Sequence, residues 1–178
     1  MPIIHQISLN GNAFDGRKYT WRQAIVNSKC TPDNTWIDPL HKRPLLKGEF
    51  ACAVSHLRVW QKIVDSGKNG IILEEDVVIH GIDTQEIDNL LKDHDSVWLG
   101  YRNNSLGYWY NAHAYAITPE IAKYLIDGYS KAIIPVDEWL PKKLKNKKNY
   151  FYKTPIVDQI PRSVRPSTIE DTEMLEGK

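Results

Sequence analysis

Cysteine is scarce in this chain. Cys30 and Cys52 are the only two cysteines among 178 residues, and no combination of Cys and His stands at the spacing of a zinc motif. A disulfide-rich scaffold and a zinc finger are therefore excluded. The two residues predict free thiols in a reducing compartment, with Cys52 buried, and we expect a cytoplasmic protein.

Long hydrophobic runs and an excess of one charge are also missing. No apolar stretch approaches about 18 residues, the length that predicts a membrane-spanning helix, and we expect no secretion signal. The 23 Lys and Arg residues are balanced by 22 Asp and Glu residues, so the net charge is +1. Such a balance produces no strong field toward nucleic acid or a membrane surface.

The composition is that of an ordinary globular domain. Hydrophobic residues make up 42% and charged residues 25% of the chain, as in typical soluble domains. A chain of this length can bury one substantial core. We expect a single domain over residues 1–160 and an irregular, partly disordered tail over 161–178.

The stretch Gly70–Ile79 is the most informative part of the chain. Aliphatic residues lead into Glu74, Glu75 and Asp76, and more aliphatic residues follow, which predicts a buried strand. Because clustered charge is costly to bury, we expect the carboxylates at the carboxyl end of that strand, where α/β sheets bind ligands. They either hold a divalent cation, which offsets their repulsion, or form a solvated turn between two strands.

Hydrophobic periodicity predicts alternating strands and helices, and hence an α/β fold with a mixed sheet. Strands are expected at 3–9, 70–79, 96–100, 112–117 and 150–152. Helices are expected at about 19–28, 48–67, 83–91 and 118–129. A turn at 10–12 follows the first strand and matches no phosphate-binding fingerprint.

The helix from Gly48 to Gly67 has the clearest pattern. Two apolar stripes run along it, which predicts packing over most of its circumference, and Gly67 is a usual C-cap residue. Ser55 and His56 lie in its middle. A lone histidine on such a face is either a satisfied core residue, the commoner case, or a ligand contact.

Two later segments lead to further expectations. Thr118 and Pro119 predict a helix start, and the core face of that helix is expected to consist of Ile121, Tyr124, Leu125 and Tyr129. The polar and aromatic segment 101–111 is either an ordinary surface loop or a mobile flap that stacks on a ligand.

A second acidic site, Asp137 and Glu138, lies inside the apolar run 133–140. The two residues are either first-turn residues favoured by a helix dipole or functional carboxylates. The basic run Lys142–Lys148 follows, and most such runs are solvated helix faces. Beside the aromatic residues at 150–152, it would also suit phosphates and bases of a nucleic acid.

The chain resembles glycosyltransferase family 25, which contains lipooligosaccharide and collagen galactosyltransferases. Residues Gly48–Trp60 match the family helix "GE-x-x-C-x-x-SH-x-x-x-W". The motifs LEDDV, V-x-L-G, AY-x-I, PVDE-x-L and P-x-V-x-Q then follow in order, at Leu73–Val77, Val97–Gly100, Ala114–Ile117, Pro135–Leu140 and Pro155–Gln159.

The resemblance implies a compact GT-A-like fold and an inverting transfer of a hexose from a nucleotide-sugar donor, with UDP as the nucleotide, to a glycan or lipid-linked saccharide. It also implies a divalent cation, manganese in preference to magnesium, held by Glu74 and Asp76. Asp137, or else Glu138, is the expected base that accepts the proton of the acceptor hydroxyl. Ser55, His56, Glu74 and Glu75 are expected to contact or orient the donor.

Two departures from the family pattern leave alternatives open. Glu75 replaces an aspartate, and the N-terminal "INLDR-x-x-R" is absent: His5–Asn10 occupies the first strand instead. One alternative is a catalytically inactive sugar-binding module of the same fold. The other is a transferase that acts on a modified DNA base, which the basic run favours and the balanced charge opposes.

Overall fold

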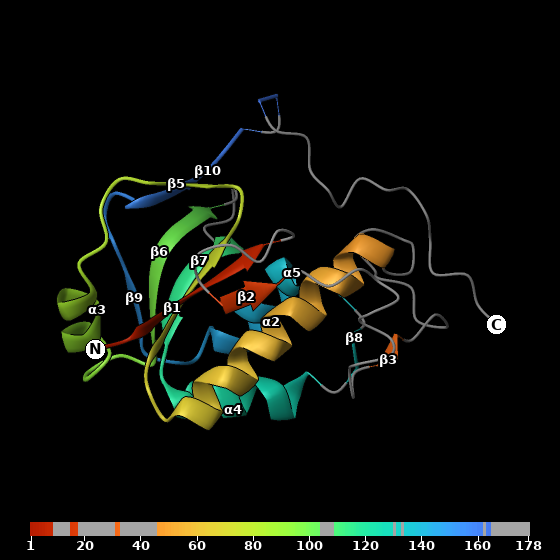
Figure 1. Ribbon diagram of the computed structural model, residues 1–178, viewed down its shortest axis with the longest axis horizontal. Coiled ribbons are helices and arrows are strands. Elements are labelled where there is room, and N and C mark those ends of the chain that lie inside the picture. The colour runs from red at the N-terminus through yellow and green to blue at the C-terminus, as the bar shows by residue number, and fades with distance from the viewer. Residues whose placement is uncertain are drawn as a thin grey trace.

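The computed structural model describes residues 1–8, 15–17, 31–32, 46–103, 109–129, 131–132, 134–161 and 163–164. This part of the chain is an α/β structure built on a six-stranded mixed sheet, with strand order β2-β1-β4-β7-β6-β9 (Figure 1). In that order the strands are Asp15–Arg17, Ile3–Ser8, Gly70–Glu74, Trp109–Ile117, Ser96–Asn103 and Asn149–Phe151. The expected fold class, α/β with a mixed sheet, is confirmed.

The strand directions place several strand ends at one edge of the sheet. β4 runs parallel to β1 and antiparallel to β7, and β7 runs antiparallel to β6. The carboxyl ends of β1, β4 and β6 therefore share an edge with the amino end of β7. We call this the carboxyl edge, and it is where open α/β sheets bind their ligands.

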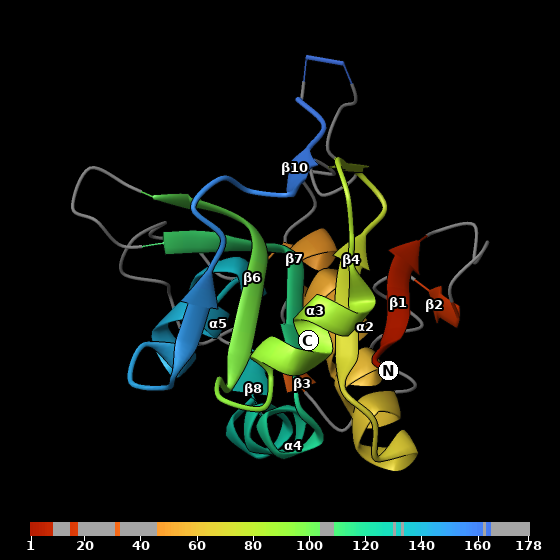
Figure 2. The same ribbon diagram turned by 90° about the vertical axis from the view of Figure 1, so that its left-hand side faces the viewer.

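Helices cover both faces of the sheet (Figures 1 and 2). The described helices are α2 (Lys47–Ser66), α3 (Thr84–Leu90), α4 (Pro119–Gly128) and α5 (Val136–Leu144). Side chains from α2, α4 and α5 form one buried core with Trp98, Tyr115 and other sheet residues. A smaller core on the opposite face joins Ile87 of α3 to Leu73 and Val97.

Two short sheets accompany the large one. β5 (Val77–Ile79) pairs antiparallel with β10 (Val157–Gln159), and β3 (Thr31–Pro32) pairs parallel with β8 (Lys131–Ala132). The β5–β10 ribbon lies above the carboxyl edge in Figure 2. No strand is expected from the sequence after 150–152, so β10 is an additional strand.

The long helix α2 has the ends and the burial that its sequence predicts. The Glu49 carboxylate accepts a hydrogen bond of 2.8 Å from the Leu46 backbone N–H, which caps the first turn. Gly67 ends the helix in the left-handed conformation, with φ 63°, which glycine adopts without strain. Residues 50–56 are buried throughout, so α2 packs on most of its circumference, as expected.

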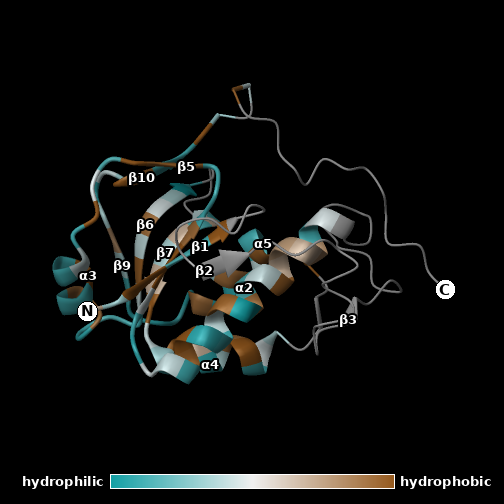
Figure 3. Ribbon diagram, viewed as in Figure 1, coloured by the Kyte–Doolittle hydropathy of each residue, from teal (hydrophilic) through white to brown (hydrophobic). Residues whose placement is uncertain are grey.

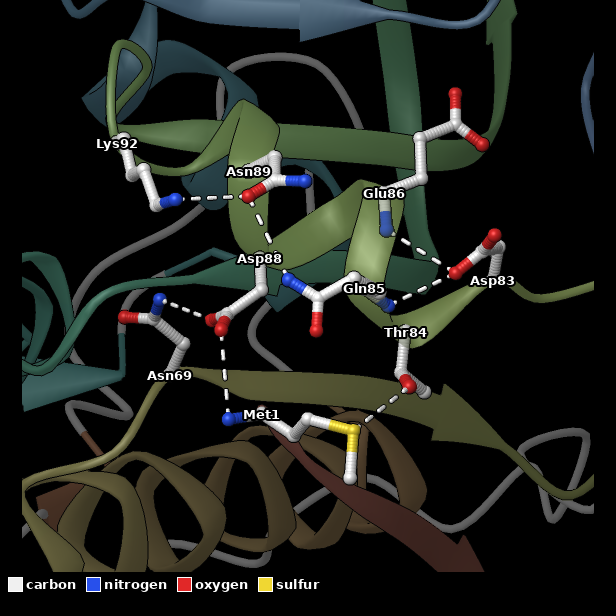
Figure 4. A network of polar contacts seen from close by, with 9 residues as sticks. All are labelled: Met1, Asn69, Asp83, Thr84, Gln85, Glu86, Asp88, Asn89 and Lys92. Carbon is white, nitrogen blue, oxygen red and sulfur yellow. Dashed lines mark hydrogen bonds and ion pairs between the residues drawn. The ribbon is translucent and has the colours of Figure 1, made fainter.

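The first strand begins beside α3, where a small polar network ties the two together (Figure 4). Asp88 accepts a hydrogen bond of 2.9 Å from Asn69, and its other oxygen lies 3.4 Å from the Met1 amine. The Asn69 bond is the main reason that the Asp88 pKa is lowered. Asp83 caps α3 by accepting from the N–H groups of Gln85 and Glu86, as its position before the helix predicts.

Several expectations were incomplete or wrong. Helix α4 alternates between hydrophobic and hydrophilic turns in Figure 3, but Tyr124, expected in its core, is 36% exposed. Strands β6 and β7 extend into the segment 101–111, so the described ends of this segment are paired strands and not a loop. The predicted turn at 10–12, the helix at 19–28 and Cys30 lie outside the described residues. None of the described helices is long and apolar enough to span a bilayer.

Candidate functional site

The acidic loop, which we define as Glu74, Glu75 and Asp76, stands at the carboxyl edge as predicted. Glu74 is the last residue of β4, and the other two form the turn that leads into β5. All three are half-buried. Both sequence interpretations therefore hold in part, because the carboxylates occupy a turn between two strands and also face the edge where ligands bind.

Asp76 is held by a residue from the far end of the chain. Its Oδ2 accepts a hydrogen bond of 2.9 Å from the Gln159 amide, and its backbone carbonyl accepts one of 2.7 Å from Ile160. Gln159 in turn accepts from the Asn111 amide at 3.5 Å. The ribbon formed by β5 and β10 thus fixes the acidic loop from outside the main sheet.

A bulge in β7 lies directly below this contact. Between the pairs Gly100–Ala114 and Arg102–Tyr110, the residues 111–113 of β7 face a single residue of β6. Asn111 has a φ of 80°, in the left-handed region that non-glycine residues seldom adopt. Bulges re-aim side chains next to functional sites, and this one directs Asn111 toward Gln159.

A chain of buried hydrogen bonds reaches the acidic loop from the core. The Trp60 indole N–H donates to the Tyr115 hydroxyl at 2.8 Å, and that hydroxyl lies 2.8 Å from Nδ1 of His56. Nε2 of His56 lies 3.1 Å from Oε1 of Glu74. The same oxygen is 3.6 Å from the Cys52 thiol, which points toward it as a donor.

The proton positions along this chain follow from what each group can do. Indole can only donate, so the Tyr115 oxygen accepts from Trp60. Burial raises the Tyr115 pKa well above its usual value, so its hydroxyl keeps a proton that needs an acceptor, and His56 Nδ1 is the one within reach. Nε2 then carries the imidazole proton and donates it to Glu74.

This assignment bears on where a metal could bind. In the described part of the chain, Cys52, His56 and Glu74 form a group whose ligand atoms lie within 4.8 Å of one another and could hold a metal ion. A ligating Nε2 would have to give up its proton, and Nδ1–H would then face the Tyr115 hydroxyl. That hydroxyl would lose its acceptor, at a cost of about 1–3 kcal/mol. The hydrogen bonds therefore favour a role for His56 in orienting Glu74.

The second acidic site lies in the first turn of α5, and it converges with the acidic loop. Asp137 Oδ1 is buried and has no hydrogen-bond partner within the described ranges. Burial, followed by the charges of Glu74, Asp76 and Glu138, raises the Asp137 pKa to about 8, against an opposing hydrogen bond from the Ala112 backbone. Carboxylates about 60 residues apart in sequence thus share one electrostatic environment.

Glu138 and three lysines of the basic run make local contacts, either with each other or with the Tyr124 ring. The Lys142 ammonium lies 3.7 Å from Oε2 of Glu138. The ammonium of Lys143 stands 4.6 Å above the Tyr124 ring, and that of Lys147 stands 4.4 Å above it. These contacts account for the exposed Tyr124, and they leave fewer cations free for a nucleic acid.

The remaining predicted residue makes a local bond. Ser55 Oγ donates to the Ala51 carbonyl of its own helix at 2.8 Å. No role is expected from the sequence for Tyr115, Gln159 or Asn111. Tyr115 and Gln159 belong to the quoted family motifs, which was a usable signal, whereas nothing in the local pattern marks Asn111.

The fold and the site together define an α/β protein whose ligand site lies at the carboxyl ends of parallel strands and is rich in carboxylates. A family model described as "Glycosyltransferase family 25 (LPS biosynthesis protein)" matches residues 5–106. The chain belongs to glycosyltransferase family 25. The match begins within β1, so the first strand is part of the family region although the expected basic residues are absent.

Several curated proteins are similar to parts of the chain. Procollagen galactosyltransferase 1 of Danio rerio is 29% identical over 155 residues, covering 72% of this chain and 25% of the relative. The procollagen lysyl hydroxylase and glycosyltransferase of Acanthamoeba polyphaga mimivirus is 31% identical over 134 residues, covering 60% and 15%. The inactive glycosyltransferase 25 family member 3 of Homo sapiens is 27% identical over 140 residues, covering 65% and 24%. The chain thus spans about a quarter or less of the length of these relatives.

Proposed function

We propose that this protein is a GT-A-like, metal-dependent hexosyltransferase that uses a UDP-sugar as donor and the hydroxyl of a glycan or lipid-linked saccharide as acceptor, in the cytoplasm. Family membership supports the reaction class. The observation that carries the proposal is the convergence of the buried Asp137 with Glu74 and Asp76, because burial and then the charges of these residues raise the Asp137 pKa to about 8. Structural carboxylates in a helix first turn need no such neighbours.

Glu74 and Asp76 are the residues that would hold the cation. They are half-buried, and their oxygens are the ligands that hard divalent cations such as Mn²⁺ and Mg²⁺ prefer. Such cations often take one or two protein carboxylates and complete their shell with phosphate oxygens and water. When bound, the cation offsets the negative charge that develops on the departing diphosphate.

Asp137 would serve as the general base. Its Oδ1 has no partner within the described ranges, so it can accept the proton of an acceptor hydroxyl. The oxygen of the acceptor hydroxyl then bonds to the anomeric carbon of the donor sugar. The bond between this carbon and the diphosphate breaks, and the configuration inverts. A carboxylate with a pKa near the working pH is suited to this transfer.

The acidic loop needs a fixed geometry for this chemistry, and two side chains supply it. His56 donates to Glu74 from the core, and Gln159 donates to Asp76 from the ribbon. Neutral donors that orient metal-binding carboxylates commonly strengthen metal binding. In this proposal His56, which the sequence predicts to contact the donor, instead supports the acidic loop, while Ser55 and Glu75 remain candidates for the donor site.

The direct test is hydrolysis of a panel of nucleotide sugars by the purified protein, with Mn²⁺, with Mg²⁺ and with EDTA. We expect slow, metal-dependent release of the nucleoside diphosphate from one UDP-sugar, and faster release once a suitable saccharide is added. Relatives include proteins named inactive, so a second measurement, donor affinity by calorimetry, is needed. Metal-dependent binding without any turnover would identify the inactive sugar-binding module.

A further inference from the structure

A pocket of about 380 Å³ opens beside the acidic loop, between the ribbon and the carboxyl end of β6. This volume is within the range of small-molecule sites. Its polar lining includes His80, Arg102, His113, Asp158 and Gln159. Gln159 also donates to Asp76, so the pocket adjoins the proposed catalytic centre.

Most acceptors in this lining are already engaged. Asp158 Oδ2 lies 2.9 Å from Nε2 of His80, so one oxygen of this carboxylate is engaged in a hydrogen bond. The Gln159 amide nitrogen donates to Asp76, and its carbonyl accepts from Asn111. The hydroxyl of Tyr101 donates to the Tyr152 carbonyl at 2.9 Å.

His113 forms the buried wall of the pocket and is only 3% exposed. Neither ring nitrogen meets the geometry of a hydrogen bond, although the nearby Val157 carbonyl favours the protonated ring slightly against the effect of burial. Gly100 makes room for the ring, because a Cβ there would collide with His113 Nε2 and with Val157. A neutral imidazole keeps one N–H donor, and the Val157 carbonyl is the backbone acceptor that interacts with this ring.

Arg102 supplies the charge. It is exposed at the pocket wall, and its guanidinium forms no ion pair with any residue that the structure describes. Burial is the main cause of the lowered His113 pKa, and the nearby Arg102 charge adds to it. The exposed Arg102 guanidinium therefore gives this wall of the pocket a cationic group with several N–H donors, which is suited to a planar or tetrahedral anion.

We propose that this pocket binds an anionic group, a phosphate or a carboxylate, carried by the acceptor saccharide. This inference rests on the proposed function. Nucleotides in α/β sheets sit beyond the carboxyl ends of adjacent parallel strands, which here are β1 and β4, on one side of the acidic loop. The pocket lies on the other side, toward β6, which assigns it to the second substrate.

The test uses probes and not turnover, so it is separate from the test of the proposed function. Glucose 6-phosphate and glucose are titrated into isotope-labelled protein, and backbone and side-chain shifts are followed by NMR. We expect glucose 6-phosphate to bind at least about tenfold more tightly than glucose, with shifts at His80, Arg102 and His113. R102Q should lose that difference. K68Q removes a charge just before the amino end of β4, away from the pocket, and should retain the difference.

Two outcomes of these sugar titrations would overturn the proposal. Equal affinity for glucose and its phosphate, or an unchanged difference in R102Q, would show that the pocket does not recognise the anion. A third arm titrates UDP with Mn²⁺ before the sugar phosphate. Competition between them, with shifts at the same residues, would assign the anion to the donor diphosphate, whereas simultaneous binding supports the acceptor.

Discussion

The acidic loop and the second acidic site are parts of one centre, but their surroundings are opposite. Two carboxylates of the acidic loop each accept a hydrogen bond from a side chain: Glu74 from His56, and Asp76 from Gln159. Asp137 has a buried oxygen without a partner. Oriented carboxylates suit the binding of a cation, and an unsatisfied one suits the acceptance of a proton. The difference in hydrogen bonding therefore supports different proposed roles for residues that composition alone cannot distinguish.

The largest effect is expected from D76A. Removing this carboxylate should abolish turnover and metal-dependent donor binding, because one of the two proposed protein ligands is lost. The fold should survive, since a repulsive charge is removed along with one hydrogen bond. Turnover assays and calorimetry with Mn²⁺ measure both effects, and D65A on the exposed face of α2 is the control. Near-normal transfer, or a wild type that EDTA does not affect, would refute the metal assignment.

The next effect is expected from D137N. Loss of a general base should reduce transfer at saturating donor by about a hundredfold or more, while donor affinity stays nearly normal because the base acts on the acceptor. E138Q should have much less effect, since Glu138 faces Lys142. Turnover and donor calorimetry of the two variants decide between them. If E138Q is the inactive variant the roles are exchanged, and if both transfer normally neither residue is the base.

A smaller effect is expected from Y115F, which tests the proton chain to Glu74. His56 loses the donor to Nδ1, so its tautomer is no longer fixed, and metal affinity should fall by about tenfold, the usual scale for a supporting residue. The tautomer itself can be read from the ¹⁵N shifts of His56. Y129F is a matched control, because Tyr129 is also buried and donates to the Ile134 carbonyl. Equal losses in the two variants would mean a general effect on packing.

The raised pKa of Asp137 has a consequence for stability. Between its ordinary value of 3.8 and about 8, the folded protein holds a proton that the unfolded chain releases. The contribution is therefore destabilising as pH rises through this window, by up to about 1.4 kcal/mol per pH unit. Denaturant unfolding of the wild type from pH 5 to pH 8 should show this slope, and D137N should flatten it. An identical slope in both proteins would place the raised pKa elsewhere.

The smallest effect is expected at the basic run. Lys142, Lys143 and Lys147 already contact Glu138 or the Tyr124 ring, so we expect no measurable DNA affinity at physiological salt. Replacing Lys143 and Lys147 by Ser should leave transfer unchanged. A gel-shift titration that shows tight, salt-sensitive binding would instead support a nucleic-acid acceptor.

The elements that were predictable from sequence owe their structure to local patterns. Helix α2 has apolar stripes and a terminal glycine, and β4 is a continuous aliphatic run ended by carboxylates. Asp83 and Thr118 cap the helices that follow them. In each case the residues that decide the structure lie within a few positions of one another.

The elements that were missed depend on partners distant in sequence. β10 has three residues and exists because β5 pairs with it. The bulge at Asn111 is a difference of register between two strands, which a single strand pattern does not encode. Tyr124 was wrongly placed in the core because an aromatic residue at helical spacing looks the same in sequence whether its ring is buried or covers the surface. The lysines that contact its ring come from α5 and the residues after it, about 20 positions along the chain. The proximity of Asp137 to the acidic loop could likewise be predicted only from the family motifs, because the two segments lie far apart in sequence.

The β5–β10 ribbon gives the site a stability of its own. Two-stranded ribbons are marginal when isolated, and this one joins Gln159 to Asp76 across 83 positions of sequence. Val157 of β10 is buried in the smaller core, so we expect local opening of the ribbon to disrupt that contact while the six-stranded sheet stays folded. Opening of the ribbon would separate Gln159 from Asp76 and remove one wall of the adjoining pocket. The core would then be native while the carboxyl edge could not bind its ligands. A ligand that requires the closed ribbon would stabilise that edge by an amount that grows with the logarithm of its concentration above Kd.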